Sequence, residues 1–428
     1  MRVAIVGAGW AGLAAAMAAT RGGHEVTLFE ASRQLGGRAR RLLVDVPGHG
    51  PAALDNGQHI LIGAYRETLG LMRLAGIDPA RVLHRLPLTL RFPDGGGLEL
   101  PDAPAPWDAA LGILRAEGWT WGDKASLLSH ASRWRLRGFR CHPQQSVAEL
   151  CEGMAPRVLH ELVEPLCVAA LNVPAQRASA AVFLRVLQDG LFGPREGSWA
   201  ASNLLLAKVD LGALFPDAAS AWLQSHGVQV HLGVRVRDLA RSGEGWQLDG
   251  EAFDAVVLAC PAWEAARLAE AGGADGWVRD ARALGHEAIA TVYATGGPRL
   301  ALPMLALRAG PAAPAQFVFD RSQLGGPTGL LAFVVSASAG DAATLERQVL
   351  QQARALGWAI DPLRTVVEKR ATFACVPGLR RPGMQVAPGL LACGDYVEGP
   401  YPATLEGAVR SALAAVSLLP AKASPPVR

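Results

Sequence analysis

The sequence predicts an α/β protein: a Rossmann-type domain into which a second domain of mixed α+β structure is inserted. Three observations support this prediction. The chain opens with the pattern strand, glycine turn, helix, strand. A second strand-rich stretch over residues 228–261 resembles a return of this domain, and a further apolar strand near the C-terminus ends in a glycine-aspartate pair. The length of 428 residues also exceeds what one hydrophobic core usually supports. The first domain is therefore expected to be assembled from separate segments of the chain.

The N-terminal βαβ unit is predicted from residues 2–30. We expect a strand over Arg2–Val6, the turn Gly7-Ala8-Gly9-Trp10-Ala11-Gly12, a helix over Leu13–Arg21 and a strand over His24–Glu30. In such a turn, Gly7 permits the reversal, Gly9 leaves room for a pyrophosphate and Gly12 lets the helix pack closely on the strand. The Glu30 carboxylate can accept hydrogen bonds from ribose hydroxyls. The pattern indicates dinucleotide binding; a glycine turn without a ligand is the alternative.

The rest of the chain alternates helical and strand-rich regions. Long helical patterns run over Ala109–Leu136 and Val147–Leu171. Strands are expected over Val228–Leu239, Gly245–Leu248, Ala255–Ala259, Leu330–Ser336 and Leu390–Ala392. We therefore assign residues 1–78, 225–284 and 385–420 to the first domain, residues 79–224 and 285–384 to the substrate domain, and residues 421–428 to a flexible tail.

Composition limits the classes of partner. Lys and Arg number 41 against 38 Asp and Glu, and a net charge of +3 without a long block of like charge argues against nucleic acid. Apolar residues make up 50% of the chain and charged residues 18%, so the protein can bury a large core and still bind an apolar ligand. The six cysteines form no CxxC pair and no metal-spaced cluster, which favours a reducing compartment and no metal site.

Other sequence signals are absent. The N-terminus enters a strand without the apolar stretch of a signal peptide, and no run of 18 apolar residues occurs. We therefore expect a cytoplasmic protein whose membrane contact, if present, is peripheral and on the inner face of the cytoplasmic membrane. The motifs HExxH and GxxxxGK[ST] and a Ser/His/Asp set are missing too, so zinc proteolysis, nucleotide hydrolysis and nucleophilic hydrolysis are not expected.

The residues after the second strand indicate which dinucleotide binds. They read Glu30-Ala31-Ser32-Arg33-Gln34-Leu35-Gly36-Gly37-Arg38. A glycine pair followed by arginine lets the loop lie flat on a cofactor while the guanidinium reaches its pyrophosphate. Near the C-terminus, Gly394-Asp395 follows an apolar strand and Leu405-Glu406-Gly407-Ala408 opens the last helix. Together these motifs resemble the flavin amine oxidase and phytoene desaturase superfamily.

This resemblance implies an amine-oxidase-like two-domain architecture and FAD as the cofactor. It places Asp395 at the ribityl or pyrophosphate end, the amides of residues 405–408 at the flavin pyrimidine, and the backbone of Val236, in a strand, at the adenine. Ala412 stands where the superfamily usually has glycine, which relaxes the packing of the last helix.

Three further segments resemble a narrower branch, the hydroxysqualene dehydroxylases of bacterial hopanoid pathways. They are Leu54-Asp55-Asn56-Gly57-Gln58-His59, residues 164–172 and residues 399–408. The branch implies reductive removal of a hydroxyl from hydroxysqualene to give squalene, a polyisoprenoid lipid as the substrate, and an external electron donor, because no second GxGxxG with strand context is present for a nicotinamide. Residues 207–211 lack the Pro-Arg pair expected before Asp210.

Three alternatives stay open. A carotenoid-type (phytoene) desaturase would use the same cofactor in the oxidising direction on a similar lipid. A flavin amine oxidase needs aromatic residues to align an amine, and the chain has only 4 tyrosines. A non-catalytic FAD-binding partner of an isoprenoid complex is the alternative from a different class.

His59 is the candidate catalytic residue. The resemblance places Gln58 and His59 in a loop close to the flavin, where the imidazole could protonate the leaving hydroxyl. The alternative is a positioning role, with Glu164, Tyr401, Glu406 or a bound water as the proton donor. Asp55 is expected to brace the loop by accepting hydrogen bonds from backbone amides.

A cluster of aromatic and basic residues occupies the middle of the chain. It comprises Trp119, Trp121, Lys124, Arg133, Trp134, Arg135, Arg137, Phe139 and Arg140. It is either the solvated face of an amphipathic helix or a patch at a membrane interface that admits a lipid-dissolved substrate.

Overall fold

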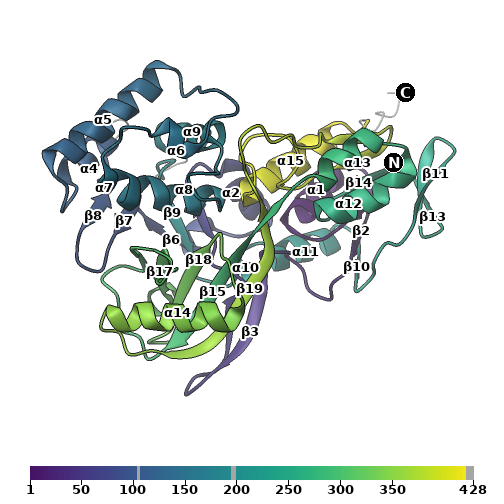
Figure 1. The fold of residues 1–428 in the computed structure, drawn as a ribbon. Helices are drawn as coiled ribbons and strands as arrows, with labels where there is room; N and C mark the ends of the chain where they lie inside the picture. Colours follow the sequence, from purple (N-terminus) through teal and green to yellow (C-terminus); the bar gives the residue numbers. More distant parts are fainter. Residues whose placement is uncertain (104–106, 194–198, 421–428) are drawn as a thin grey trace.

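A six-stranded sheet lies at the centre of one lobe of the molecule (Figure 1). The computed structural model describes residues 1–103, 107–193 and 199–420. The strand order is β10-β2-β1-β14-β21-β20, and all strands are parallel except β20. The strands are β1 Arg2–Val6, β2 Glu25–Glu30, β10 Gln229–Leu232, β14 Ala255–Leu258, β20 Gln385–Ala387 and β21 Leu390–Ala392. N-terminal, central and C-terminal segments thus share one sheet, which confirms the predicted Rossmann-type α/β fold.

The two faces of this sheet bury different partners, because alternate side chains of a strand point to opposite sides. Val3 and Ile5 pack in a core with one set of helices, whereas Ala4 and Val6 belong to a core that includes Trp246. The first face carries α1 Trp10–Arg21, α11 Pro216–Ser225 and α15 Leu405–Ser417. The second carries α12 Ala262–Ala269, α13 Asp275–Arg282 and the antiparallel strands β11 Leu239–Ser242, β12 Gly245–Leu248 and β13 Glu251–Phe253.

An antiparallel five-stranded sheet, in the order β16-β17-β18-β15-β19, forms the centre of the second lobe. The strands are β15 His286–Thr295, β16 Met304–Ala306, β17 Phe317–Asp320, β18 Leu331–Ser336 and β19 Asp361–Phe373. One face is covered by α14 Ala342–Ala355, whose Leu345 and Val349 pack in a core with Phe333. Tyr293 and Val334 point the other way, into the large core shared with the helices of this lobe.

The remaining strands and helices precede, follow or lie between the elements of the two sheets along the chain. The strands are β3 Arg41–Val46, β4 Gly50–Asp55, β5 Ile60–Ile62, β6 Leu83–Leu86, β7 Thr89–Arg91, β8 Gly97–Glu99 and β9 Leu204–Ala207. The helices are α2 Arg66–Leu74, α3 Pro79–Val82, α4 Trp107–Arg115, α5 Trp121–Leu136, α6 Val147–Leu150, α7 Pro156–Val158, η1 Leu159–Val163, α8 Glu164–Leu171, α9 Ala180–Phe192, α10 Leu211–Leu214, η2 Glu270–Gly272 and η3 Arg321–Leu324. Because β9 pairs with both β5 and β6, one small sheet joins residues on both sides of the expected domain boundary at residue 78.

Each of the two long helices expected from the sequence is divided into shorter helices. The expected helix over Ala109–Leu136 ends with α4 and restarts as α5, because Gly118 adopts a positive φ of +77° and Thr120 caps the new helix through a capping box with Asp123. The expected helix over Val147–Leu171 is divided in the same way into α6, α7, η1 and α8. Its η1 turn is a π-helix that ends two residues before Pro165, which has no amide hydrogen to donate.

Two other segments differ from the expectation. Residues 228–239 do not form one strand: β10 ends at Leu232, Gly233 turns with a φ of +74°, and Val236 lies in a loop before β11. Residues 211–224, assigned to the substrate domain, pack on the first domain instead, with the Phe215 ring 4.9 Å from that of Trp10. The domain boundaries otherwise stay a prediction, and the expected tail at 421–428 lies outside the described residues.

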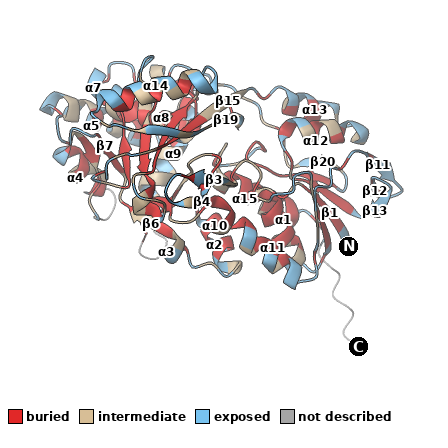
Figure 2. Ribbon diagram, turned by 90° about the horizontal axis from the view of Figure 1, so that it is seen from below, coloured by how far each residue is buried: buried red, intermediate tan, exposed pale blue. Residues whose placement is uncertain are grey.

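Burial follows the two sheets and the inner faces of their helices (Figure 2). All six cysteines are free thiols, and five of them are buried. Within the described part of the chain, no group of His, Cys, Asp and Glu has the arrangement of a metal site. No helix in that part combines the length and the apolar character needed to cross a bilayer.

The contact between Gly12 and Gly7 predicts a stability effect. A Cβ on Gly12 would lie 1.8 Å from the Gly7 carbonyl oxygen, so α1 would have to move off β1. We expect Gly12→Ala to lower the free energy of unfolding by on the order of 3 kcal/mol, measured by urea unfolding followed by circular dichroism. Gly70→Ala is the matched control, since Gly70 lies exposed in α2 with no atom near its Cβ position. It should unfold at an equal or higher urea concentration, and equal midpoints for the two variants would contradict the packing argument.

Candidate active site

The site is a cavity of about 860 Å³ that receives residues from both lobes. Most of the residues proposed from the sequence line it: Gly7, Gly9, Trp10, Ala11, Glu30, Ala31, Gly36, Gly37, Arg38, Gln58, His59, Val236, Gly394, Asp395, Leu405 and Ala408. Gly12, Glu406 and Gly407 do not line it. Polar and charged groups gather at the end near β1 and β2, whereas apolar side chains form the other end.

Three glycines shape the polar end, each for a different reason. Gly7 has a φ of +111°, and a Cβ there would lie 2.7 Å from the Ala259 carbonyl oxygen. Gly12 allows α1 to touch the Gly7 carbonyl. At Gly9, by contrast, a Cβ would meet only the Cα of Gly37, at 3.8 Å. The space beside Gly9 is therefore open toward the cavity.

The N-terminus of α1 suits an anionic group. Gly9 is its N-cap residue and supplies no side-chain acceptor, so the first-turn amides of Trp10 and Ala11 lack a side-chain cap. These amides and the helix dipole together attract phosphate groups. The Glu30 carboxylate lies beside this turn and accepts hydrogen bonds from the amides of Ala8, at 2.6 Å, and Ser32, at 2.8 Å. Because each carboxylate oxygen has a second lone pair, it can still accept a ribose hydroxyl.

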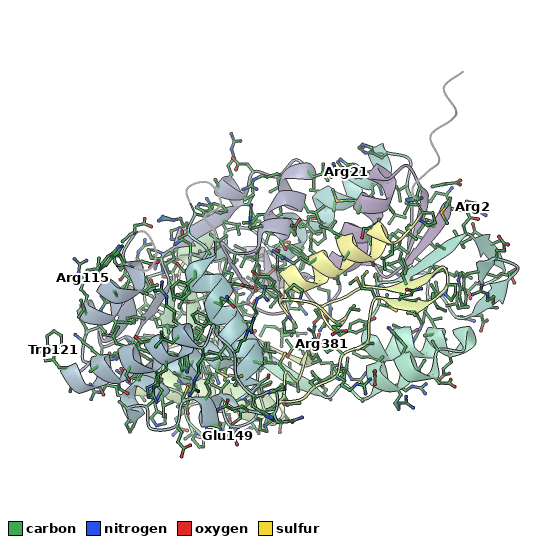
Figure 3. The ribbon with its side chains drawn as sticks, turned by 90° about the horizontal axis from the view of Figure 1, so that it is seen from above. Arg2, Arg21, Arg115, Trp121, Glu149 and Arg381 are labelled. Carbon is green, nitrogen blue, oxygen red and sulfur yellow. The ribbon has the colours of Figure 1, made fainter. Side chains whose placement is uncertain are left out.

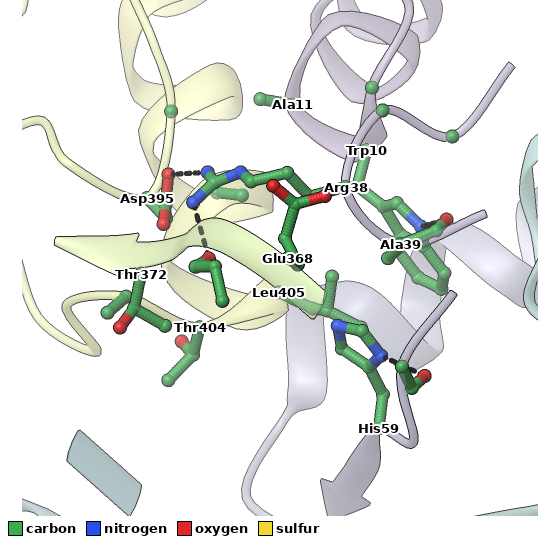
Figure 4. Close-up of a pocket in the computed structure, with 18 of the residues that line it drawn as sticks. Trp10, Ala11, Arg38, Ala39, His59, Glu368, Thr372, Asp395, Thr404 and Leu405 are labelled. Atoms are coloured by element: carbon green, nitrogen blue, oxygen red, sulfur yellow. Dashed lines mark hydrogen bonds and ion pairs between the residues drawn. The ribbon is translucent and has the colours of Figure 1, made fainter. Parts of the chain in front are cut away.

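Arg38 and Asp395 form an ion pair in the wall of the cavity (Figure 4). A second guanidinium nitrogen of Arg38 donates to the Ala371 carbonyl at 2.8 Å. Burial opposes the charge on Arg38, but the adjacent Asp395 carboxylate outweighs it and raises the pKa of Arg38. The sequence resemblance directs Arg38 to a pyrophosphate; in the structure its guanidinium is held by protein groups at the same end of the cavity.

Only two of the four residues in the first turn of α15 line the cavity. Leu405 and Ala408 line the cavity, whereas the fully buried Glu406 carboxylate turns to α2 and accepts hydrogen bonds from the amides of Glu67 and Thr68. Glu406 also pairs with Arg410 at 2.7 Å. Its side chain therefore does not reach the cavity, and Glu406 is no longer a candidate proton donor.

Val236 and Gly407 have different surroundings from those expected. Val236 lines the cavity from a loop, not a strand, and its carbonyl accepts a hydrogen bond from Arg267 at 2.9 Å. Gly407 is required for packing: a Cβ there would lie 2.0 Å from the Tyr401 carbonyl oxygen.

His59 faces the cavity from the loop after β4 (Figure 4). Its Nδ1 lies 2.9 Å from the Gly57 carbonyl, and because a carbonyl can only accept, Nδ1 carries the proton. Burial lowers the pKa of His59, and the positive charge of Arg38 lowers it further, against the raising effect of the Gly57 bond. The imidazole is therefore mainly neutral at pH 7, and Nε2 is then an acceptor.

A buried polar network holds the same loop, and no sequence motif predicts two of its members. Gln58 donates to the Tyr293 hydroxyl at 2.8 Å, and this hydroxyl donates to the Asp55 carbonyl at 2.8 Å. Arg321, only 3% exposed, donates to the Gln58 side-chain oxygen at 3.3 Å. Tyr293 and Arg321 belong to the second lobe and carry no motif, so only the tertiary fold reveals them.

Asp55 has the bracing role expected from the sequence. Its carboxylate accepts a hydrogen bond from the Leu211 amide at 2.7 Å. Burial raises the pKa of Asp55 to about 7, although the Leu211 bond and the Arg321 charge act in the opposite direction. Asp55 therefore links the loop before His59 to the first turn of α10.

The other end of the cavity is apolar. Its wall includes Leu166 and Val168 of α8, Leu187 and Leu191 of α9, and Phe317, Phe319 and Val334 of the antiparallel sheet. These side chains offer few hydrogen-bonding groups. A long hydrocarbon ligand would therefore bury its surface there without leaving polar groups unpaired.

Two further candidates for proton transfer can now be placed. Glu164 does not line the cavity and forms a hydrogen bond with His160 Nδ1 at 2.9 Å. Tyr401 does line it, with a positive φ of +58°. Burial raises the pKa of Tyr401 to about 12, helped by the negative charge of Asp189. Of the proposed protein donors, His59 and Tyr401 thus lie in the cavity.

The chain was compared with proteins of known sequence. It is 28% identical to a hydroxysqualene dehydroxylase of Rhodopseudomonas palustris, over 97% of this chain and 98% of the relative. A hydroxysqualene dehydroxylase of Zymomonas mobilis is 26% identical over the same shares. A probable zeta-carotene desaturase of Synechococcus elongatus is also 26% identical, but over 56% of this chain and 51% of the relative.

Solved structures share the fold. An oxidoreductase from Methanosarcina mazei superposes with a TM-score of 0.72 at 16% identity, covering 97% of this chain and all of the other. A putrescine oxidase superposes with a TM-score of 0.64 at 14% identity, covering 97% and 98%. The family model described as "Flavin containing amine oxidoreductase" matches residues 10–419. With an open glycine turn, an uncapped helix terminus and an acidic residue at one end of its cavity, the chain belongs to the flavin containing amine oxidoreductase family, and its cofactor is FAD.

Proposed function

We propose that the protein is an FAD-dependent hydroxysqualene dehydroxylase, which removes the hydroxyl of hydroxysqualene reductively to give squalene. The observation that carries this proposal is that one cavity has both a polar end suited to a dinucleotide and an apolar end. Its apolar end matches a polyisoprenoid in chemistry. The proposal is also supported by relatives of this name that align over nearly the full length of both chains.

The reaction must balance in atoms and electrons. A C–OH bond breaks, a proton joins the oxygen, a hydride joins the carbon, and squalene and water result. Reduced FAD, when bound, supplies the hydride. The protein binds and orients both partners and excludes water. The two electrons come from an external reductant, which is a further part of the proposal.

Most of the proposed cofactor-binding residues lie at or behind the polar end, and Gln58 and His59 lie where the two ends join. The proposed residues are Gly7, Gly9, Trp10, Ala11, Gly12, Glu30, Ala31, Gly36, Gly37, Arg38, Gln58, His59, Val236, Gly394, Asp395, Leu405, Glu406, Gly407 and Ala408. Within this set, Gly12, Glu406 and Gly407 act indirectly, since they support the backbone that lines the cavity. Arg38 and Asp395 fix the two chain segments that meet at this end.

His59 is proposed as the residue that protonates the departing hydroxyl, with Tyr401 as the alternative. The Gly57 carbonyl fixes the ring tautomer, so a proton taken up at Nε2 can be delivered into the cavity only from that nitrogen. The lowered pKa makes protonated His59 a stronger acid but reduces its population at neutral pH. Gln58, Tyr293 and Arg321 hold the loop and act as positioning residues.

Two other functions fit the observations less well. A carotenoid-type desaturase would also use an apolar cavity, but the desaturase relative aligns with only about half of this chain. Three tyrosines, Tyr65, Tyr396 and Tyr401, line the described cavity wall, so aromatic side chains for an amine are present. An amine oxidase is nevertheless supported less, because the relatives that align over nearly the full length of both chains are hydroxysqualene dehydroxylases. A non-catalytic FAD-binding partner would leave bound FAD unreactive toward any polyprenyl compound.

Product analysis tests the proposed reaction. Anaerobic incubation of the purified holoprotein, reduced with dithionite, should convert hydroxysqualene to squalene and reoxidise the flavin with equal stoichiometry. Gas chromatography would quantify squalene, and absorbance would follow the flavin. A lengthened polyene formed with an electron acceptor would favour the desaturase, and peroxide released with amines would favour the amine oxidase. Reduced flavin that hydroxysqualene does not oxidise, together with oxidised flavin that neither a polyprenyl compound nor an amine reduces, would overturn an enzymatic role.

Gly9→Val tests the polar end. The space beside Gly9 is open in the protein, so the variant should fold, but its side chain would occupy the position of the pyrophosphate. We expect a large loss of FAD per protein by absorbance, with an unchanged circular dichroism spectrum. Glu30→Ala should weaken FAD binding less, by about 10- to 150-fold, as one charge-assisted hydrogen bond is worth about 1.5–3 kcal/mol. Asp395→Ala should also lose FAD.

A glycine outside the cavity provides the matched control. Gly285 lies exposed with open space at its Cβ position, so Gly285→Val should retain FAD. Full FAD content in Gly9→Val would refute the proposed position of the cofactor.

His59→Phe tests the proton donor. The variant should keep FAD, because the cofactor is held mainly at the polar end, and it should lose roughly 10²- to 10⁴-fold in turnover, as expected for a general acid. In the parent, kcat/KM should fall as the pH rises through the lowered pKa of His59, below its ordinary value of about 6.5. This pH dependence should be absent in the variant. A small change in turnover, or loss of FAD together with activity, would shift the donor role to Tyr401 or water, and Tyr401→Phe would separate those two.

A further inference from the structure

An exposed apolar surface lies on the helical end of the second lobe. We define the α4–α5–α9 surface by its six large exposed apolar residues: Trp107, Leu114, Trp121, Leu128, Leu136 and Phe192. Leu136 is 87% exposed and Trp121 is 75% exposed. In Figure 3, Trp121 projects outward at the end of the molecule opposite Arg2. Several large apolar side chains exposed at one end of a molecule commonly mark a binding site for another molecule.

Only some residues of the aromatic and basic cluster that the sequence contains are exposed in the structure. Trp119 and Trp134 are each 7% exposed and belong to the core. On α5, the buried side is formed by Leu127 and His130 with Trp134. Trp121, Leu128 and Leu136 are spaced by seven and eight residues, which places them together on the opposite side. Among the residues that the structure describes, none covers these three side chains, each of which is at least 37% exposed.

Four arginines accompany the stripe: Arg133, Arg135, Arg137 and Arg140. All are exposed, and none forms an ion pair with a carboxylate among the described residues. The guanidinium of Arg135 lies over the Phe192 ring, 5.6 Å from its centre. Apolar side chains flanked by unpaired arginines match the boundary between acyl chains and anionic headgroups in both polarity and charge.

The same surface adjoins the apolar end of the cavity. Leu187 and Leu191 of α9 line the cavity, and the next residue, Phe192, is 39% exposed. Phe139, which follows α5, packs against Phe192 with ring centres 5.5 Å apart. The C-terminal end of α9 thus separates the cavity from the exposed surface by the thickness of one helix.

We propose that the α4–α5–α9 surface docks on an anionic lipid bilayer and that the hydrocarbon substrate passes from the bilayer into the cavity beside the C-terminal end of α9. The docking surface stands on its own observations, whereas the identity of the substrate rests on the proposed function. Phe192 and Phe139 form the boundary that the lipid passes. A polyisoprenoid taken up in this way never has to cross water.

Vesicle sedimentation tests the docking surface independently of turnover. The FAD-loaded parent should sediment with vesicles of phosphatidylcholine and phosphatidylglycerol, less with phosphatidylcholine alone, and less at high salt. Replacing Arg133, Arg135, Arg137 and Arg140 by Ser should reduce the vesicle affinity about fivefold for each arginine, the equivalent of about 1 kcal/mol each. Leu136→Asp should also reduce it. FAD content and turnover of detergent-solubilised substrate should be kept in both variants.

Leu43→Asp is the matched control. Leu43 is 70% exposed on β3, away from α5 (Figure 1), so its variant should sediment like the parent. Failure of the parent to bind anionic vesicles, or equal binding by the parent and the four-arginine variant, would overturn the proposal. A parent that is dimeric by light scattering and becomes monomeric in Leu136→Asp would overturn it too, and would assign the surface to a second copy of the chain. Vesicle binding without squalene formation would support the docking surface and refute only the proposed reaction.

Discussion

The ion pair between Arg38 and Asp395 connects the parts of the chain that build the cavity. Arg38 follows β2 near the N-terminus, Asp395 follows β21 near the C-terminus, and the Ala371 carbonyl that also binds Arg38 belongs to β19 of the second lobe. Removing Arg38 would leave the buried Asp395 carboxylate without its partner, which typically costs about 3–5 kcal/mol. Removing Asp395 would cost less, because the Arg38 side chain is 35% exposed and keeps part of its hydration. The relative position of the two sheets thus depends on a pair whose members are more than 350 residues apart.

This constraint explains why one cavity can have two chemically different ends. Strand ends of a parallel sheet supply backbone amides, a carboxylate and a helix terminus, which suit a charged dinucleotide. The antiparallel sheet and α8 and α9 supply apolar side chains on their inner faces. Because Arg38, Asp395 and Ala371 hold these surfaces together, a cofactor and a hydrocarbon can meet where the two ends join, near His59.

The sequence predicts the parts of the site that depend on local structure. Gly7, Gly9 and Gly12 require their conformations within one turn, and Glu30 lies on the adjacent strand, so the motif determines their arrangement. Tyr293 and Arg321 could not be found in this way, because they reach Gln58 only through the packing of the second lobe. Glu406 lies in a recognisable motif, but its carboxylate points to α2, because the Thr68 amide of that helix donates a hydrogen bond to it. The motif does not include α2, so it does not predict where the Glu406 side chain points.

The burial of His59 and the apolar lining of the cavity restrict how the proposed reaction can proceed. Burial lowers the pKa of His59 because an imidazolium ion loses hydration there, and the same loss of hydration disfavours a carbocation left by a departing hydroxyl. The positive charge of Arg38 adds to the penalty for the imidazolium ion. Separate, long-lived charges are therefore costly in this site, so protonation of the oxygen, cleavage of the C–O bond and hydride addition at carbon must follow one another closely. The apolar wall then has a second effect besides binding the hydrocarbon: it keeps out water, which would otherwise capture the carbon centre and restore the alcohol.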